Sequence, residues 1–208
     1  MRILGIDPGS RLTGYGCIDW SSNRISLVTH GTLHLANTSG KATIPLEERL
    51  LSIYEGLGRI IREYKPDLMA VEKVFFAKNA VSALKLGQAR GAVLLTGMIH
   101  GLKIAEYSPT EVKLAIVGHG QADKEQVAKM IEYMIGAQEF ASTDASDALA
   151  LAICHAHTTR APRAHSNSSY AQALHAASGK RSRKNRSLAE SLGITAEQAF
   201  GKKRITLR

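Results

Sequence analysis

RILGIDPGSRLTGYGCIDW, residues 2–20, sets the pattern from which the rest of the domain follows. The run 2–7 is mainly apolar, ends in an acid and is followed by Pro8-Gly9, which is typical of a buried strand that enters a tight turn. Residues 14–20 and 24–35 are also strand-like, and a short polar turn separates them. Three sequential strands with short connections predict an antiparallel meander.

The later apolar patterns predict helices that alternate with two further strands. Short apolar runs predict the strands, and apolar residues three or four positions apart predict the helices. The expected strands are 67–72 and 103–107, and the expected helices are 45–64, 79–101, 109–117, 124–135 and 143–157. This order predicts an α/β fold, a mixed five-stranded sheet flanked by helices.

The expected helix 79–101 has apolar residues nearly all round its circumference, which predicts that it is well buried. Gly87, Gly91 and Gly97 lower its intrinsic helix propensity. We therefore expect other backbone segments to approach it closely at these glycines.

The composition excludes some classes of protein. No apolar run approaches the roughly 18 residues of a membrane-spanning helix, which argues against an integral membrane protein. Cys17 and Cys154 are the two cysteines among 208 residues, too few for a disulfide framework or a zinc quartet. A reducing cytoplasm is the expected location.

The positive charge is confined to the C-terminal quarter. Residues 160–208 hold 11 Lys and Arg against 2 acids, which accounts for the whole formal charge of +9, whereas residues 1–159 balance at 16 against 16. Such a segment is typical of binding to a polyanion, either nucleic acid or an acidic membrane surface. The alternative is that it only increases solubility.

The change in composition also predicts the domain boundary. Residues 1–158 are expected to form the folded domain, and 159–208 a basic, flexible tail. Within the tail, Ser187 and Glu190 have the spacing of a capping box, so a short helix over 188–199 is possible.

Two acids lie where expected strands end. Asp7 and Glu72 each follow an apolar run, and a side chain at the end of a rigid central strand opens onto the edge of the sheet. For either acid alone, an ordinary turn or surface residue is the favoured interpretation.

A second pair of acids begins the last helix. Asp144 and Asp147 are three residues apart, which places both carboxylates on one helix face, about 5–6 Å apart at Cβ. Thr143 is the expected cap, and acids suit a first helical turn. The almost wholly apolar continuation 148–153 turns Asp147 inward, where an acid needs a partner or a metal.

Four carboxylates that converge without a basic neighbour in sequence would repel one another, and divalent cations are the natural remedy. Oxygen-only ligands suit Mg²⁺ or Mn²⁺. Two such ions about 3.5–4 Å apart can promote in-line displacement at a phosphodiester. The acidic pattern, together with the basic tail, predicts metal-dependent phosphodiester cleavage.

Four stretches resemble the RuvC-type Holliday junction resolvases. They are GIDPGSRLTGYG at 5–16, AVEKVFFAKNAVSALKLGQARG at 70–91, YSPTEVKLAIVGHGQADKEQV at 107–127 and DASDALALAICH at 144–155. The similarity extends over about 1–157 and does not include the tail.

The resemblance implies an RNase H-like nuclease domain that works as a Mg²⁺-dependent homodimer, with two ions per subunit for which Mn²⁺ can substitute. It implies that paired, symmetric nicks resolve four-way DNA junctions in homologous recombination and repair, beside a branch-migration helicase complex. It also assigns the catalytic and metal-binding roles to the four acids already singled out, Asp7, Glu72, Asp144 and Asp147.

The resemblance further implies DNA contacts at Phe75, Lys78, Lys113 and Lys124. An aromatic ring inserted at the centre of a junction replaces lost base stacking. Without the resemblance, Phe75 would be an ordinary core residue, and the three lysines would be ordinary surface lysines.

Two other functions remain open at this point. Asp7-Pro8-Gly9 with Thr13-Gly14 is similar to the phosphate loop of actin-like and sugar-kinase ATPases, although a second phosphate motif and an adenosine pocket are not evident. The other is a junction-binding protein that does not cleave, against which the four intact acids argue, because clustered negative charge does not favour DNA binding.

Overall fold

The computed structural model describes residues 1–160 except 23, 37–43, 74–78 and 137–141, and residues 1–160 form one compact unit. The expectations for Phe75, Lys78, the tail 159–208 beyond residue 160 and the helix 188–199 therefore lie outside the described residues.

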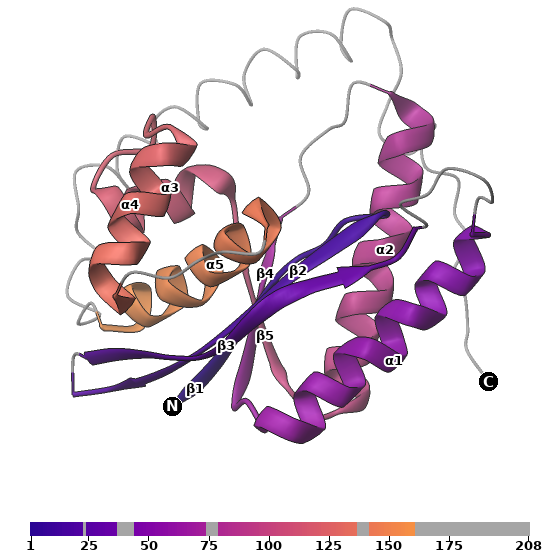
Figure 1. Ribbon diagram of the computed structural model, residues 1–208, viewed down its shortest axis with the longest axis horizontal. Coiled ribbons are helices and arrows are strands. Elements are labelled where there is room, and N and C mark those ends of the chain that lie inside the picture. The colour runs from indigo at the N-terminus through magenta and orange to yellow at the C-terminus, as the bar shows by residue number, and fades with distance from the viewer. Residues whose placement is uncertain (23, 37–43, 74–78, 137–141, 161–208) are drawn as a thin grey trace, which may run out of the picture. The chain divides into compact units, whose positions relative to one another are not determined.

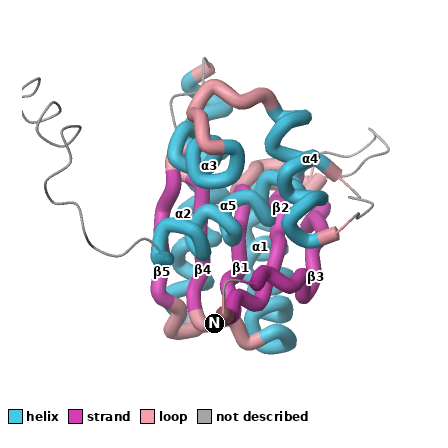
Figure 2. The backbone as a smooth tube through the Cα atoms, turned by 90° about the vertical axis from the view of Figure 1, so that its left-hand side faces the viewer, coloured by secondary structure: helices cyan, strands magenta, loops and turns pink. Residues whose placement is uncertain are grey.

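A mixed five-stranded sheet forms the centre of this unit. Its strands are β1 (Arg2–Asp7), β2 (Leu12–Ser21), β3 (Arg24–His34), β4 (Leu68–Glu72) and β5 (Lys103–Tyr107). The order is β3-β2-β1-β4-β5, with β1 to β3 antiparallel and β4 and β5 parallel to β1 (Figure 2). The meander and the mixed sheet predicted from the sequence are confirmed.

Helices cover both faces of the sheet (Figure 1). They are α1 (Leu46–Tyr64), α2 (Ala80–Ile99), α3 (Pro109–Val117), α4 (Lys124–Ile135) and α5 (Thr143–Arg160). The buried side chains of α1 and α2 form one core with the sheet, and those of α3, α4 and α5 form the other.

Ser142 Oγ accepts from the backbone N–H of Ala145, so Ser142 and not Thr143 supplies the side-chain cap of α5. A serine one residue earlier reaches the free N–H groups of the first turn, whereas Thr143 already lies within the helix.

Alternation along the strands determines which core each side chain enters. In β1, Ile3 belongs to the core beneath α5, and Leu4 and Ile6 belong to the core beneath α1 and α2. Because successive strand residues face opposite sides, Asp7 shares the face of Ile3. β4 follows the same rule, with Ala70 in the α5-side core, so Glu72 also faces α5.

The prediction that α2 is buried all round is wrong. Its buried residues are Ala89, Val93, Thr96 and Gly97, and a second side of the helix is exposed. Large apolar residues on that side include Val81, Leu84, Leu95, Met98 and Ile99, each more than half exposed. An apolar helix is buried only where elements pack on it, and α2 packs mainly on α1 and β5.

The three glycines of α2 differ from one another. A Cβ added at Gly97 would collide with the side chain of Met69, so a side chain approaches α2 there and not the backbone segment that the sequence predicts. Added Cβ atoms at Gly87 and Gly91 would meet no atom within 4 Å in the described part of the chain. The close approach predicted for these two is therefore absent within this unit.

Among the described residues, no helix has the length and apolar character needed to cross a membrane.

Candidate active site

The ends of two neighbouring parallel strands place the first two acids side by side. β1 ends at Asp7 and β4 ends at Glu72, and the strands pair in register up to Ile6 and Val71. Because both carboxylates follow the last paired residues on the same sheet face, they point into the space between the sheet and α5.

The N-terminal half of α5 lies directly on β1 and β2, because glycines leave room for it. An added Cβ at Gly5 would overlap the carbonyl of Ala148, and one at Gly14 would overlap the carbonyl of Asp144. Two sheet positions without side chains thus allow the helix backbone to approach closely. This contact brings Asp144 and Asp147 to the ends of β1 and β4, as the sequence predicts.

Substituting Gly14 by Ala is expected to disrupt this contact. The added methyl group would meet backbone rather than a flexible side chain, so α5 must shift, and overpacking of this kind costs roughly 1–3 kcal/mol of folding free energy. Urea unfolding measures that loss. The control is Gly87→Ala, where the space is open, and equal stabilities of the two variants would contradict the expectation.

All four acids line one pocket of about 230 Å³. The pocket lies between the strand ends and the first turns of α3, α4 and α5. Its lining consists of Asp7, Glu72, Pro109, Val112, Lys113, Lys124, Val127, Asp144, Asp147, Ala150 and Leu151. Residues from widely separated parts of the sequence therefore form a single site, which joins acids, two lysines and an apolar wall.

Burial and the neighbouring carboxylates raise the pKa values of two acids of the pocket, Asp7 and Glu72. Burial is the largest cause that raises the pKa of Asp7 to about 7, and the charges of the other three carboxylates add to it. Burial also raises the pKa of Glu72, although a hydrogen bond from the Asp7 carboxyl works in the opposite direction. Below about pH 7 the Asp7 carboxyl therefore keeps its proton when no cation is bound.

Lys124 supplies the positive charge that is missing from the local sequence. Its Nζ lies 2.9 Å from Asp147 Oδ2, so the ion pair joins α4 to α5. The hydrogen bond to Asp147 is the largest cause that raises the pKa of Lys124. The Lys124 side chain is 77% exposed, so this ion pair adds little stability.

The donor set fits a hard divalent cation. Four carboxylates offer only oxygen ligands, which suit Mg²⁺ and similar ions. Burial and the three neighbouring carboxylates raise the pKa of Asp7, and a bound cation would offset both effects. However, no three His, Cys, Asp or Glu side chains in the described ranges are already gathered as a metal cage. Asp147 is paired with Lys124, and Asp7 with Glu72, so ion binding would have to exchange these partners.

Thr13 does not line the pocket but holds the turn beside it, a role that the sequence does not reveal. It is fully buried, and its hydroxyl donates to the carbonyl of Gly9 and accepts from the N–H of Gly9. These bonds close the turn that follows Asp7. A buried threonine six residues after a strand-end acid is not distinctive in a single sequence, and neither are Gly5 and Gly14.

Comparison with known proteins agrees with this architecture. The family model of crossover junction endodeoxyribonuclease RuvC matches residues 3–155. A relative of that name from Geobacter sulfurreducens is 54% identical over 158 residues, which cover 76% of this chain and 93% of the relative. One from Methylococcus capsulatus is 51% identical over 156 residues, 75% of this chain and 90% of the relative.

Solved structures lead to the same family. RuvC of T. thermophilus in complex with Holliday junction substrate is 32% identical, with a TM-score of 0.69 over 77% of this chain and 95% of that one. The yeast mitochondrial Holliday junction resolvase Ydc2 is 12% identical and shares the fold, with a TM-score of 0.56 over 74% of this chain and 77% of that one. With the family model matched over most of the folded unit, the chain belongs to the crossover junction endodeoxyribonuclease RuvC family.

Proposed function

We propose that this protein is an endonuclease that resolves four-way DNA junctions by paired, symmetric nicks in homologous recombination and repair. The observation that carries the proposal is the gathering of Asp7, Glu72, Asp144 and Asp147 in one pocket of a chain that belongs to the RuvC family. Neither an ATPase nor a binding protein without cleavage receives support from the comparisons.

The family match implies catalysis that depends on a divalent metal. We assign its binding to the four carboxylates and propose two Mg²⁺ ions per subunit, with Mn²⁺ able to substitute. When bound, the ions would neutralise the pocket, activate the attacking water and stabilise the leaving oxygen. Asp7 and Glu72, on rigid strand ends, fix one side of the ligand set, and Asp144 and Asp147 fix the other.

Lys113 and Lys124 are proposed to contact the phosphates of the cleaved strand. Both line the pocket with the acids, and a lysine beside a phosphate acts as a compact positive charge. Phosphate binding would draw Lys124 away from Asp147. Phe75 and Lys78 are proposed, from the family resemblance, to contact the junction centre and a nearby phosphate.

Cleavage of a synthetic four-way junction tests the proposal. Each strand is end-labelled in turn, and the products are compared with Mg²⁺ and with EDTA. We expect nicks in two opposed strands at symmetric positions, with ends that a ligase can seal, and none in EDTA. Binding without nicks would favour the non-cleaving alternative, and junction-independent ATP hydrolysis would favour the ATPase.

We propose that the protein works as a homodimer, with the exposed side of α2 as its contact surface. Val81, Leu84, Gly91, Leu95 and Met98 follow one another at spacings of three, four or seven residues, so they form a stripe along one side of the helix. A second copy would cover this stripe, and Gly91 would allow its backbone to approach closely. A two-fold axis suits a junction that needs two symmetric cuts. Light scattering measures the mass, and a monomer at working concentration would contradict the proposal.

The proposed location is the cytoplasm, where the substrate DNA and reducing conditions for the free, buried Cys17 and Cys154 coexist. A branch-migration helicase complex is the proposed partner, from the family resemblance alone.

Residues 1–158 are proposed to form the nuclease domain, and the basic tail 159–208 to tether DNA. Deleting 161–208 is expected to weaken junction binding and to flatten its salt dependence, because fewer counterions are released. Affinities measured at several salt concentrations give the slope. A matched control keeps residues 161–208 but replaces their ten Lys and Arg by Gln. An unchanged slope in both variants would refute the tether.

A further inference from the structure

Arg90 of α2 joins three elements at the end of β4. Its Nε donates to the carbonyl oxygen of Glu72 at 3.3 Å, and its Nη2 forms an ion pair with Glu106 Oε1 of β5. The Arg90 side chain is 22% exposed, so solvent screens this ion pair less than the pair of Lys124 with Asp147. Arg90 does not line the acidic pocket.

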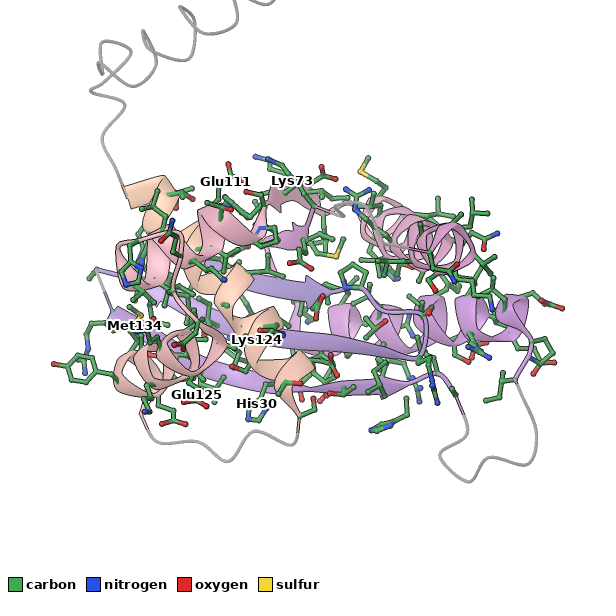
Figure 3. All side chains as sticks on the ribbon, turned by 90° about the horizontal axis from the view of Figure 1, so that it is seen from above. His30, Lys73, Glu111, Lys124, Glu125 and Met134 are labelled. Carbon is green, nitrogen blue, oxygen red and sulfur yellow. The ribbon has the colours of Figure 1, made fainter. Side chains whose placement is uncertain are left out.

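The strand end that Arg90 holds is the one that carries Glu72. Pairing of β4 with β1 ends at Val71, one residue earlier, so Glu72 projects beyond the ladder on that side. On the other side, Glu72 is still paired with Tyr107 of β5, and the N–H of Lys73 donates to the carbonyl of Tyr107. The Nζ of Lys73 also reaches Glu111 of α3 at 3.3 Å, and the two side chains lie side by side in Figure 3.

We propose that Arg90 is a positioning residue that fixes the backbone of Glu72, and with it the place of the Glu72 carboxylate in the pocket. The planar guanidinium bonds a carboxylate and a carbonyl at once, which lysine cannot reproduce in the same geometry. Groups behind the ligands of a metal orient those ligands, and losing one typically costs 10–100-fold in metal affinity or activity.

The same residue connects the site to the proposed dimer helix. Arg90 adjoins Gly91 of the exposed stripe, and its side chain reaches the strand that ends in Glu72. A second copy packed on α2 would therefore restrict the movement of the helix that carries Arg90. The inference rests on the proposed endonuclease function and adds a route from the dimer surface to one of its acids.

The test compares Arg90→Gln with Arg2→Gln. Arg2 is a matched control because it also joins a carboxylate, Asp19, to a carbonyl, that of Tyr64, at the opposite end of β1. Two quantities are measured: single-turnover cleavage of fully bound junction, and the Mg²⁺ concentration that gives half of the metal-induced rise in melting temperature. The second readout needs neither DNA nor activity.

For Arg90→Gln we expect cleavage to fall roughly 10- to 100-fold and the Mg²⁺ midpoint to rise roughly tenfold. Junction affinity should stay within about twofold of wild type, because no DNA contact is removed. Arg2→Gln is expected to lower the melting temperature while leaving both quantities at wild-type values. Arg90→Lys should recover only part of each loss, because it restores one of the two bonds.

A wild-type rate and midpoint in Arg90→Gln would overturn the proposal, as would equal losses in Arg2→Gln. Should Arg90→Gln not fold, Glu106→Gln keeps the guanidinium while removing the charge that orients it, and the same two outcomes decide. Wild-type protein that fails to nick the junction would refute the proposed function instead, and the Mg²⁺ midpoint would still test Arg90.

Discussion

The Asp7→Asn variant is expected to bind four-way junctions with nearly unchanged affinity and to cleave them about 1,000-fold more slowly or not at all. Asparagine keeps the shape of the side chain but removes the negative charge of one proposed metal ligand at the end of β1. Each 1.4 kcal/mol lost from transition-state stabilisation costs a factor of ten in rate, and a catalytic metal supplies several kcal/mol. Gel-shift binding and single-turnover cleavage of the same labelled junction separate the two effects.

The control for Asp7→Asn is Glu125→Gln, which also removes one negative charge. Glu125 is exposed on α4 beside Lys124 and is not among the residues that line the pocket (Figure 3). We expect cleavage at the wild-type rate from this variant. Wild-type cleavage by Asp7→Asn would instead disprove the proposed mechanism.

Asp7→Asn is also expected to stabilise the folded protein at pH 8, but not at pH 4, when no divalent metal is present. The pKa of Asp7 rises from 3.8 to about 7 on folding, so the folded state holds a proton that the unfolded state has lost between these values. Stability therefore falls as pH rises from 3.8 to about 7, and the loss is complete above that range. The asparagine side chain does not titrate, so the variant avoids the loss.

The size of this effect is at most about 4 kcal/mol above pH 7, because the pKa shift spans about three units and one unit corresponds to 1.36 kcal/mol. Urea unfolding in EDTA, at pH 4 and pH 8, measures it for both proteins. Adding Mg²⁺ at pH 8 should then stabilise the wild type more than the variant. A difference between the two proteins that is the same at both pH values would show that burial of charge is not the cause.

Much of the fold follows from local patterns that survive into the folded state. Short apolar runs such as 2–7 and amphipathic spacing such as that of 45–64 predict β1 and α1 almost to the residue. The helix α2 is predicted correctly, but its complete burial is not. An apolar circumference does not reveal which side of a helix lacks a neighbour in the same chain. Coverage is a property of the assembled elements, and Leu84 and Leu95 remain exposed although they resemble core residues.

The four acids could be predicted because each stands at a marked place in a local pattern. Asp7 and Glu72 end apolar runs, and Asp144 and Asp147 share a helix face. The partners of Lys124 and Arg90 could not be predicted in the same way, because a lysine or arginine on a helix has many possible neighbours. Asp147 lies 23 positions from Lys124, and Glu106 and Glu72 lie 16 and 18 positions from Arg90.

The order of apolar and acidic residues along the chain was enough to specify the elements and to single out the four acids that the structure gathers in one pocket, since apolar runs and helical spacings are local features of the sequence. Packing between distant segments settled the rest. Gly5 and Gly14 admit the backbone of α5, and this contact sets how closely the acids approach one another. Tertiary packing also determines the charge of the pocket, the raised pKa of Asp7 and the contact of Arg90 with Glu72. Electrostatic and hydrogen-bond energies depend on separation in space and not along the sequence.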